Sequence, residues 1–245
     1  MSRLARKFYD LAVSEGEGLG TVYEYMVKYR LLNKVVLKNE KSKVLIAGLP
    51  EKYGYSLDFI SFCEENNSNY DILDERTGKL SVLRRILKKS NKNPGAVRLC
   101  DLSGIEDIYA NKSFDLALSC EVLQRLSPDN QIRYVRSLKN IAKRVILFVP
   151  NGDNRCHQSH SGLNGVKMQA LIKQLDITNI NKYRDAGYVD MPPWPPGVKN
   201  NPLKGGVGRA ICNISLSILR VISAIEPFYP GLFKLKYAHL IYTVW

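Results

Sequence analysis

The chain has 245 residues, of which 45% are hydrophobic, and it carries a formal net charge of +13. A chain of this length can bury the core of one domain with a small extension. It has no positively charged start followed by an apolar core, so we expect no secretory signal. Its five cysteines show no pairing pattern, which is typical of a reducing compartment, and we expect a cytoplasmic protein.

The most apolar late segment covers residues 207–225, and Arg209 and Arg220 interrupt it. The uninterrupted part is too short to cross a bilayer. This segment therefore predicts an amphipathic helix in a soluble protein with no transmembrane segment.

The positive charge is concentrated in the second half of the chain. Residues 1–122 contain 19 Lys and Arg against 17 Asp and Glu, a net of +2, whereas residues 123–245 contain 17 against 6, a net of +11. Such a basic half attracts anions such as RNA, phosphorylated metabolites or an acidic lipid surface. The alternative is that the basic surface only keeps the protein soluble.

Short apolar runs alternate with helical patterns along the chain. A helical region at residues 20–36 precedes expected strands at 43–48, 70–74, 96–101, 114–119 and 144–150, with helices at 56–66, 77–89 and 129–142 between them. This alternation predicts an α/β fold built from parallel βαβ units, with a sheet covered on both faces. Ligands of such sheets bind at the carboxyl ends of the strands.

Acidic side chains follow several of these strand ends. Asp74, with Glu75 beside it, closes the second strand about 25 residues after Gly48, where a carboxylate can accept from both hydroxyls of a ribose. Asp101 closes the third strand and is a candidate acceptor for an adenine amino group. Ser119 and Glu121 flank the end of the fourth strand. Each Asp alone is better explained as a helix N-cap, but the spaced set favours a nucleotide site.

Residues 112–130, KSFDLALSCEVLQRLSPDN, resemble the fourth-strand segment of the class I S-adenosylmethionine-dependent methyltransferases, particularly of the branch that acts on small molecules. Residues 144–151 resemble the fifth strand of that family, and residues 237–245 its last strand. The resemblance covers about residues 40–190 and the final strand. It implies a Rossmann-like three-layer αβα sandwich, with a mostly parallel seven-stranded sheet, an antiparallel last strand and S-adenosyl-L-methionine as the cofactor.

The first loop departs from the family pattern of an acidic residue followed by Gly-x-Gly-x-Gly. Ile46 occupies the acidic position, and only Gly48 and Gly54 of the loop GLPEKYG match. Pro50 removes a backbone N–H, and Glu51 is a candidate to hold the ammonium of the ligand. The predicted cofactor contacts are Gly48, Glu51, Gly54, Asp74, Glu75, Asp101, Leu102, Ser119 and Glu121. The alternative is that the altered loop no longer binds cofactor.

Two histidines lie in residues 151–165, after the fifth strand. His157 and His160 are candidate catalytic residues, as an acceptor-side base or a substrate contact, although ordinary loop histidines are the alternative. We assign His239, in the final strand, a structural role. His157 and His160 with Cys156 would make a poor tetrahedral zinc cage because they share one loop, so no metal is expected.

Trp194, in the proline-rich residues 190–197, is a candidate wall of a substrate pocket through stacking of its flat ring. Packing against the body of the protein is the alternative reading.

We expect an N-terminal helical segment at 1–42 and a methyltransferase-like domain at 43–245, with a helical insertion at about 203–228. The favoured function is methyl transfer to a small-molecule or lipid-like acceptor. The alternatives are an RNA methyltransferase and a non-catalytic binding protein with this fold.

Overall fold

The computed structural model describes residues 3–35, 42–51, 54–174, 186–191, 193 and 205–245. The strands are β1 (Lys43–Ala47), β2 (Asn69–Asp74), β3 (Ala96–Leu99), β4 (Phe114–Cys120), β5 (Ala142–Pro150), β6 (Ala186–Val189) and β7 (Leu240–Val244). The helices are α1 (Arg3–Ser14), α2 (Leu19–Val35), α3 (Leu57–Glu65), α4 (Thr77–Lys89), α5 (Pro128–Ile141), α6 (Arg155–Ser161), α7 (Met168–Gln174), α8 (Gly205–Ile225) and α9 (Gly231–Tyr237). Short 3₁₀ turns are η1 (Leu102–Asp107), η2 (Leu123–Arg125) and η4 (Glu226–Phe228).

The seven strands form one sheet in the order β3-β2-β1-β4-β5-β7-β6. Strands β1 to β5 are parallel, and β7 runs antiparallel between β5 and β6. The predicted Rossmann-like sheet with an antiparallel last strand is therefore confirmed. The sequence pattern did not single out β6, which has only four residues and pairs only with β7 among the described strands.

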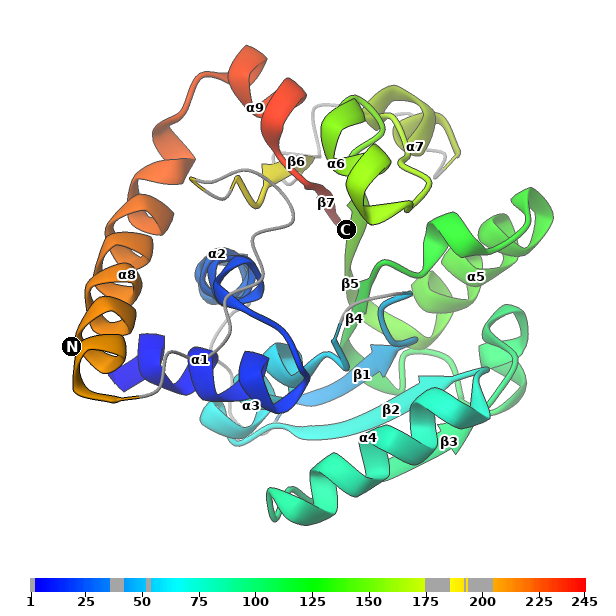
Figure 1. The fold of residues 1–245 in the computed structure, drawn as a ribbon. Coiled ribbons are helices and arrows are strands. Elements are labelled where there is room, and N and C mark those ends of the chain that lie inside the picture. Colours follow the sequence, from blue (N-terminus) through cyan, green and yellow to red (C-terminus); the bar gives the residue numbers. More distant parts are fainter. Residues whose placement is uncertain (1–2, 36–41, 52–53, 175–185, 192, 194–204) are drawn as a thin grey trace.

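The side chains of β1 pack alternately into two hydrophobic cores, one on each face of the sheet, because successive side chains of a strand point to opposite faces. Val44 and Ile46 pack with α1 to α4 and α8 on one face. Leu45 and Ala47 pack with η1, α5 and α7 on the other. Figure 1 shows α1, α2 and α8 on one side of the sheet and α5 on the opposite side. Both faces are thus covered, as expected for parallel strands.

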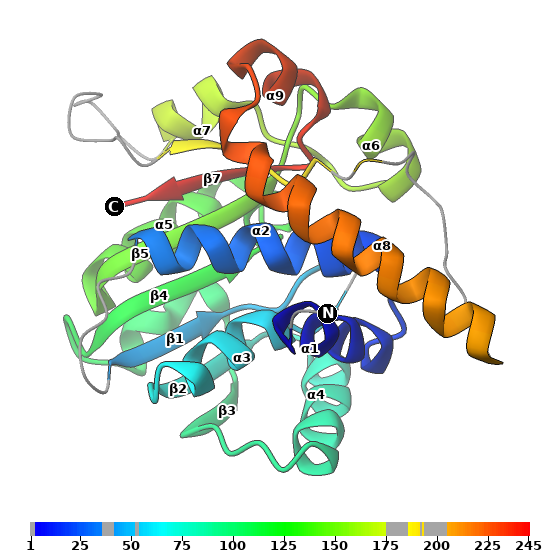
Figure 2. The same ribbon diagram turned by 90° about the vertical axis from the view of Figure 1, so that its left-hand side faces the viewer.

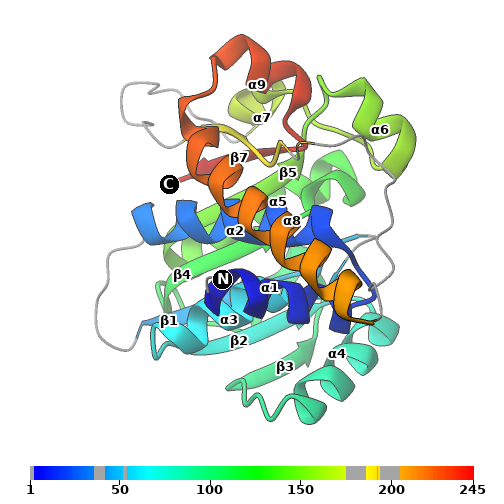
Figure 3. The same ribbon diagram turned by 60° about the vertical axis from the view of Figure 1, so that its left-hand side comes forward.

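The N-terminal helices belong to the same core as the sheet. Phe8 of α1 and Tyr23 of α2 are fully buried in it. Figures 2 and 3 show α2 lying along the sheet and α8 crossing it on the outside. Leu216 and Leu219 of α8 are fully buried in this layer, so they anchor the helix to it. The division at residue 42 remains a prediction.

Two turns at the carboxyl edge of the sheet require a left-handed backbone. Gly48, after β1, has a φ of +76°, and a Cβ there would lie 2.6 Å from Cγ2 of Val122. Glu121, after β4, has a φ of +52° despite its side chain, which is uncommon for a residue other than glycine. The ends of β1 and β4 therefore meet tightly at the edge where ligands are expected.

Candidate active site

Asp74 lies at the end of β2 and is fully buried. Its carboxylate accepts hydrogen bonds from the backbone N–H of Leu49 at 2.7 Å and from the backbone and guanidinium of Arg76 at 2.8–2.9 Å. Arg125 donates a further bond at 3.2 Å. Burial alone would raise the pKa of Asp74, but hydrogen bonds from Arg76 and Leu49 and the charges of both arginines outweigh it, so this pKa lies below its usual value.

Arg76 also holds the loop that follows β1. Its Nη2 donates to the carbonyl oxygens of Leu49, at 2.7 Å, and Pro50, at 3.2 Å, and its Nη1 donates to that of Glu51, at 3.3 Å. One guanidinium thus joins the end of β2 to three consecutive carbonyls of the altered glycine loop. The loop is fixed by a side chain two residues after Asp74.

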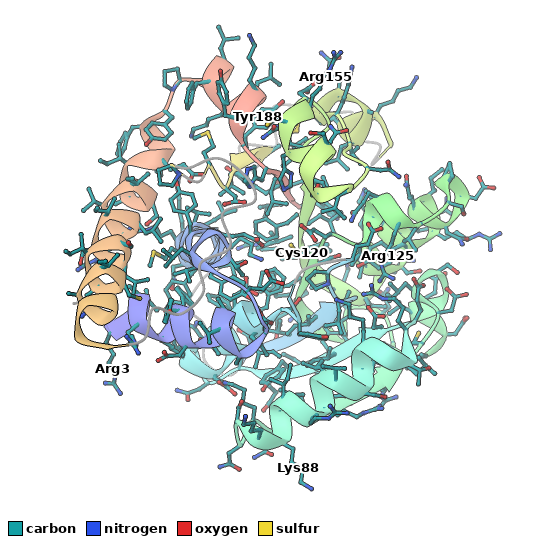
Figure 4. All side chains as sticks on the ribbon, viewed as in Figure 1. Arg3, Lys88, Cys120, Arg125, Arg155 and Tyr188 are labelled. Carbon is teal, nitrogen blue, oxygen red and sulfur yellow. The ribbon has the colours of Figure 1, made fainter. Side chains whose placement is uncertain are left out.

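Arg125 reaches the same place from the other side, since it belongs to η2 after β4. Its Nη1 donates to Glu75 at 2.6 Å, and its Nη2 donates to Asp74. The side chain is only 9% exposed, and Figure 4 shows Arg125 beside the strand ends, near Cys120. The two arginines, Asp74 and Glu75 form one ion cluster, which we call the arginine clamp.

The other predicted cofactor contacts lie around the clamp in different environments. The side chain of Glu51 accepts from Gln124 at 3.0 Å, and Leu102 is fully buried near Gly48. Gly54 has a φ of +72° and lies against Glu15.

Asp101 is exposed and caps η1 through the backbone N–H and hydroxyl of Ser103. Ser119 is hydrogen-bonded to the Tyr134 hydroxyl at 2.7 Å, among residues of the core that contains α5.

Helix α2 carries a buried lysine, Lys28, that the sequence analysis did not single out. Lys28 is 2% exposed, and its Nζ forms ion pairs with Glu24 at 2.6 Å and Asp58 at 2.9 Å. The same nitrogen lies 4.8 Å from the ring centroid of Phe59 and 3.7 Å from Sγ of Cys120. A lysine within the apolar pattern of the expected helical region 20–36 is the only signal that the sequence offers for this group.

Glu121 is a neighbour of this lysine and is 6% exposed. Its Oε2 has no hydrogen-bond partner among the described residues. Burial, followed by the charge of Glu24, raises the pKa of Glu121 to about 8, although the charge of Lys28 acts in the opposite direction. A buried acid with a free oxygen at a strand end is typical of a functional site.

His239, the residue before the start of β7, contributes a second polar group. His239 Nδ1 lies 3.0 Å from Oδ2 of Asp190, and its ring stacks on His157 at 4.0 Å between centroids. Glu226 accepts from the backbone N–H of Asp190 at 2.8 Å and from the hydroxyl of Tyr23. Burial lowers the pKa of His239 to about 4, so its imidazole is neutral at pH 7.

His157 therefore lies near the start of β7, beside His239, to which the sequence analysis assigned only a structural role. His160 belongs to α6, and its side chain lies outside the described part of the structure. Trp194 also lies outside the described residues. Among the residues that the structure describes, no group of three His, Cys, Asp or Glu is arranged to hold a metal ion.

Comparisons with models of known protein families and with curated protein sequences find no match. Among solved structures, the chain is similar to an S-adenosylmethionine-dependent methyltransferase from Archaeoglobus fulgidus, with a TM-score of 0.54 and 12% identity over 90% of this chain and 93% of that one. The fold is that of the class I methyltransferases. A methyltransferase from Clostridium acetobutylicum ATCC 824 gives 0.50 and 12%, over 91% of this chain and 90% of that one.

A methyltransferase-fold enzyme with a known small-molecule ligand is also similar. Geranyl diphosphate C-methyltransferase from Streptomyces coelicolor A3(2), in complex with Mg²⁺, geranyl-S-thiolodiphosphate and S-adenosyl-L-homocysteine, has a TM-score of 0.54 and 8% identity. The match covers 89% of this chain and 74% of that one. At these identities the likeness establishes the fold alone.

The arginine clamp decides how a nucleoside would fit this methyltransferase fold. A carboxylate offers about four lone-pair sites, and Asp74 already receives bonds from Leu49, Arg76 and Arg125. A ribose at Asp74 must therefore displace Arg76 and Arg125. With these two side chains turned outward, the residues fit: Asp74 offers acceptors to hydroxyl groups, and the charge of a cation beside Glu121 would favour the carboxylate form of this buried acid.

Proposed function

We propose that the chain is an S-adenosylmethionine-dependent methyltransferase that acts on a small-molecule or lipid-like acceptor. The observation that carries this proposal is the buried Asp74 carboxylate at the end of β2, beside the left-handed Gly48 turn. In a class I methyltransferase fold, this is where a ribose diol would be held. The likeness to geranyl diphosphate C-methyltransferase supports the small-molecule acceptor class.

In this proposal the cofactor supplies an activated methyl group, and the chain orients it. Asp74 and Glu75 would hold the ribose once the clamp opens, and Asp101 and Leu102 would lie beside the adenine. Glu51 and Glu121 would face the cationic methionine end. Alignment of donor and acceptor can supply much of the rate enhancement in a displacement of this kind.

His157 is the candidate acceptor-side residue. It stacks on His239, whose neutral ring is oriented by Asp190. A base at this position would accept a proton from an acceptor hydroxyl or amine. His160 and Trp194 remain predictions from the sequence.

Calorimetric titration with S-adenosylmethionine and S-adenosylhomocysteine tests the proposal. We expect saturable binding that weakens about 100-fold in Asp74→Asn, because the neutral amide has a single accepting oxygen and cannot make two charge-assisted hydrogen bonds to the ribose. We expect Arg76→Ala to bind about tenfold more tightly, because a competitor for Asp74 is removed. Arg85→Ala, an exposed arginine on α4, is the control and should not change the affinity.

Far-UV circular dichroism establishes that each variant is folded, and a gain of affinity cannot arise from misfolding. Absence of binding by the folded wild type and by folded Arg76→Ala would overturn the proposal. It would favour the second candidate, a non-catalytic binding protein. The observation in favour of that candidate is the arginine clamp itself, which occupies the acceptors that a cofactor needs.

A further inference from the structure

Helix α8 and the segment after it expose an apolar surface on the outside of the molecule. Five residues of α8 at alternating spacings of three and four, with residues of η4 and α9, form what we call the outer apolar face: Ile211, Ile214, Ile218, Val221, Ile225, Phe228, Leu232, Phe233 and Tyr237. Ile214 is 60% exposed, Phe228 83% and Leu232 82%. An apolar stripe of this length marks an interaction surface.

The opposite side of α8 is packed into the protein. Leu216, Leu219 and Ser223 are buried against the layer that contains α1 and α2. Residues Ala210–Phe228 form a helix long and apolar enough to cross a bilayer, judged by length and composition alone. Because one side is already packed and Arg220 lies within it, this helix is suited to lie along a surface.

A groove of about 720 Å³ opens beside the outer apolar face, between α8, α1 and α2. Arg30 and Arg220 line it together with the apolar side chains of Leu216, Val221 and Ile225. Arg30 donates to the backbone carbonyl of Arg220 at 3.4 Å. Within the described part of the chain, no carboxylate forms an ion pair with either arginine, so both charges are available to an anion.

The charge around the face is positive. Residues 205–245 contain four Lys and Arg and a single acidic residue, Glu226, which is buried and bonded to Tyr23. Lys236 is exposed on α9, and Arg220 is exposed on α8. Exposed apolar side chains mixed with basic ones are the composition of helices that lie in the interface of anionic membranes.

We propose that the outer apolar face docks on an anionic lipid bilayer, and that the groove holds a lipid phosphate against Arg30 and Arg220. The apolar side chains would enter the headgroup region, and the basic residues would face the lipid phosphates. Val221 and Ile225 belong to both the face and the groove, so a lipid head could enter the groove from the bilayer. This docking does not depend on cofactor binding.

A second copy of the chain is a less suitable occupant of this face. A symmetric dimer would place the same patch on both sides of the interface. The single acidic residue of segment 205–245, Glu226, is buried, so this segment offers no exposed carboxylate to the basic residues of the second copy, and like charges that face each other are unfavourable. An anionic bilayer satisfies the apolar and the basic residues together.

Vesicle flotation tests the proposal, with vesicles of phosphatidylcholine alone or mixed with phosphatidylglycerol. We expect the wild type to float with the mixed vesicles and to bind pure phosphatidylcholine at least tenfold more weakly. Ile214→Asp combined with Leu232→Asp should reduce binding at least tenfold, because both side chains enter the bilayer. Ile132→Asp on α5, at a residue 45% exposed, is the matched control and should bind as the wild type.

The groove has its own test. Arg30→Glu combined with Arg220→Glu should reduce binding to the mixed vesicles by about tenfold or more, since each basic residue near an anionic surface adds about a fivefold affinity. Lys88→Glu combined with Arg85→Glu, on α4, is the charge-matched control. Equal losses in both pairs would show that total charge alone attracts the lipid, and would overturn the role of the groove.

The position of the face in the bilayer is measured with Phe228→Trp. We expect the fluorescence of the added indole to shift to the blue and to be quenched by brominated lipids. No flotation with either vesicle would overturn the proposal. Sedimentation of the wild type as a dimer that Ile214→Asp converts to a monomer would also overturn it, in favour of a second copy.

Discussion

At the scale of single residues, the unusual feature is the number of buried ionisable groups between α2 and the strand ends. Lys28 lies between Glu24 and Asp58, and Glu121 and Asp190 are buried nearby. Burial of such groups opposes folding unless they are paired. Buried ionisable groups of this kind often gather at functional sites, and these lie at the edge of the sheet that carries the candidate site.

Glu121 makes the stability of the protein depend on pH. Its pKa rises from an ordinary 4.5 to about 8 in the folded state, so between these values the folded chain binds more protons than the unfolded one. The free energy of unfolding should therefore fall as pH rises from about 4.5 to 8, by up to about 1.4 kcal/mol per pH unit from this group.

Urea denaturation across this pH range measures the effect. Glu121→Gln removes the titrating group, so the fall with pH should become shallower. Glu106→Gln, at an exposed residue, is the control and should keep the wild-type slope. An unchanged slope in Glu121→Gln would contradict the assignment.

At the scale of elements, one turn after β5 holds the C-terminal part of the chain. Asn151 is fully buried, and its Nδ2 donates to the carbonyls of Leu235 and Ala238 at 2.9 Å. Asn154 donates to Tyr237 and Ala238 from the same turn. These bonds place α9 and the start of β7, and with them His239, beside the candidate site.

Asn151→Ala should reduce the free energy of unfolding by about 1–3 kcal/mol, because the part-buried carbonyl of Leu235 loses this donor and the buried carbonyl of Ala238 keeps only the longer bond from Asn154. Chemical denaturation measures this change. Asn140→Ala removes an exposed amide that donates to Glu106, and it should change stability by no more than about 0.5 kcal/mol. Equal effects of the two substitutions would show that the turn does not fix the C-terminal segment.

At the scale of the whole molecule, the net charge of +11 in residues 123–245 suits any polyanion, whereas the outer apolar face suits a bilayer and offers nothing to RNA. RNA binding through charge alone weakens steeply with salt, because counterions are released. Insertion of apolar side chains is much less sensitive to salt. Retention of RNA at low and at high salt therefore tests the RNA hypothesis for the basic half.

Filter binding of RNA at low and high salt measures this. For a methyltransferase with a small-molecule or lipid-like acceptor, we expect little retention of RNA at either concentration. Strong retention at low salt that disappears at high salt would instead favour the RNA methyltransferase hypothesis.

Most of the fold could be predicted from the sequence. The apolar runs at 43–48, 70–74 and 114–119 appear as β1, β2 and β4 with boundaries within one residue. Burial on both faces of a parallel sheet leaves such a continuous apolar signal. The edge strand β6 left none, since it is short and its pairing with β7 is decided by the rest of the sheet.

The sequence by itself determined the order of elements and the strand ends that carry Asp74, Asp101 and Glu121, because these patterns are local. Only the tertiary structure decided that Arg76 and Arg125 take the acceptors of Asp74. It likewise brought Tyr23 to Glu226, 203 residues away. Contacts of this kind depend on how distant segments pack, and neither residue type nor spacing records that packing.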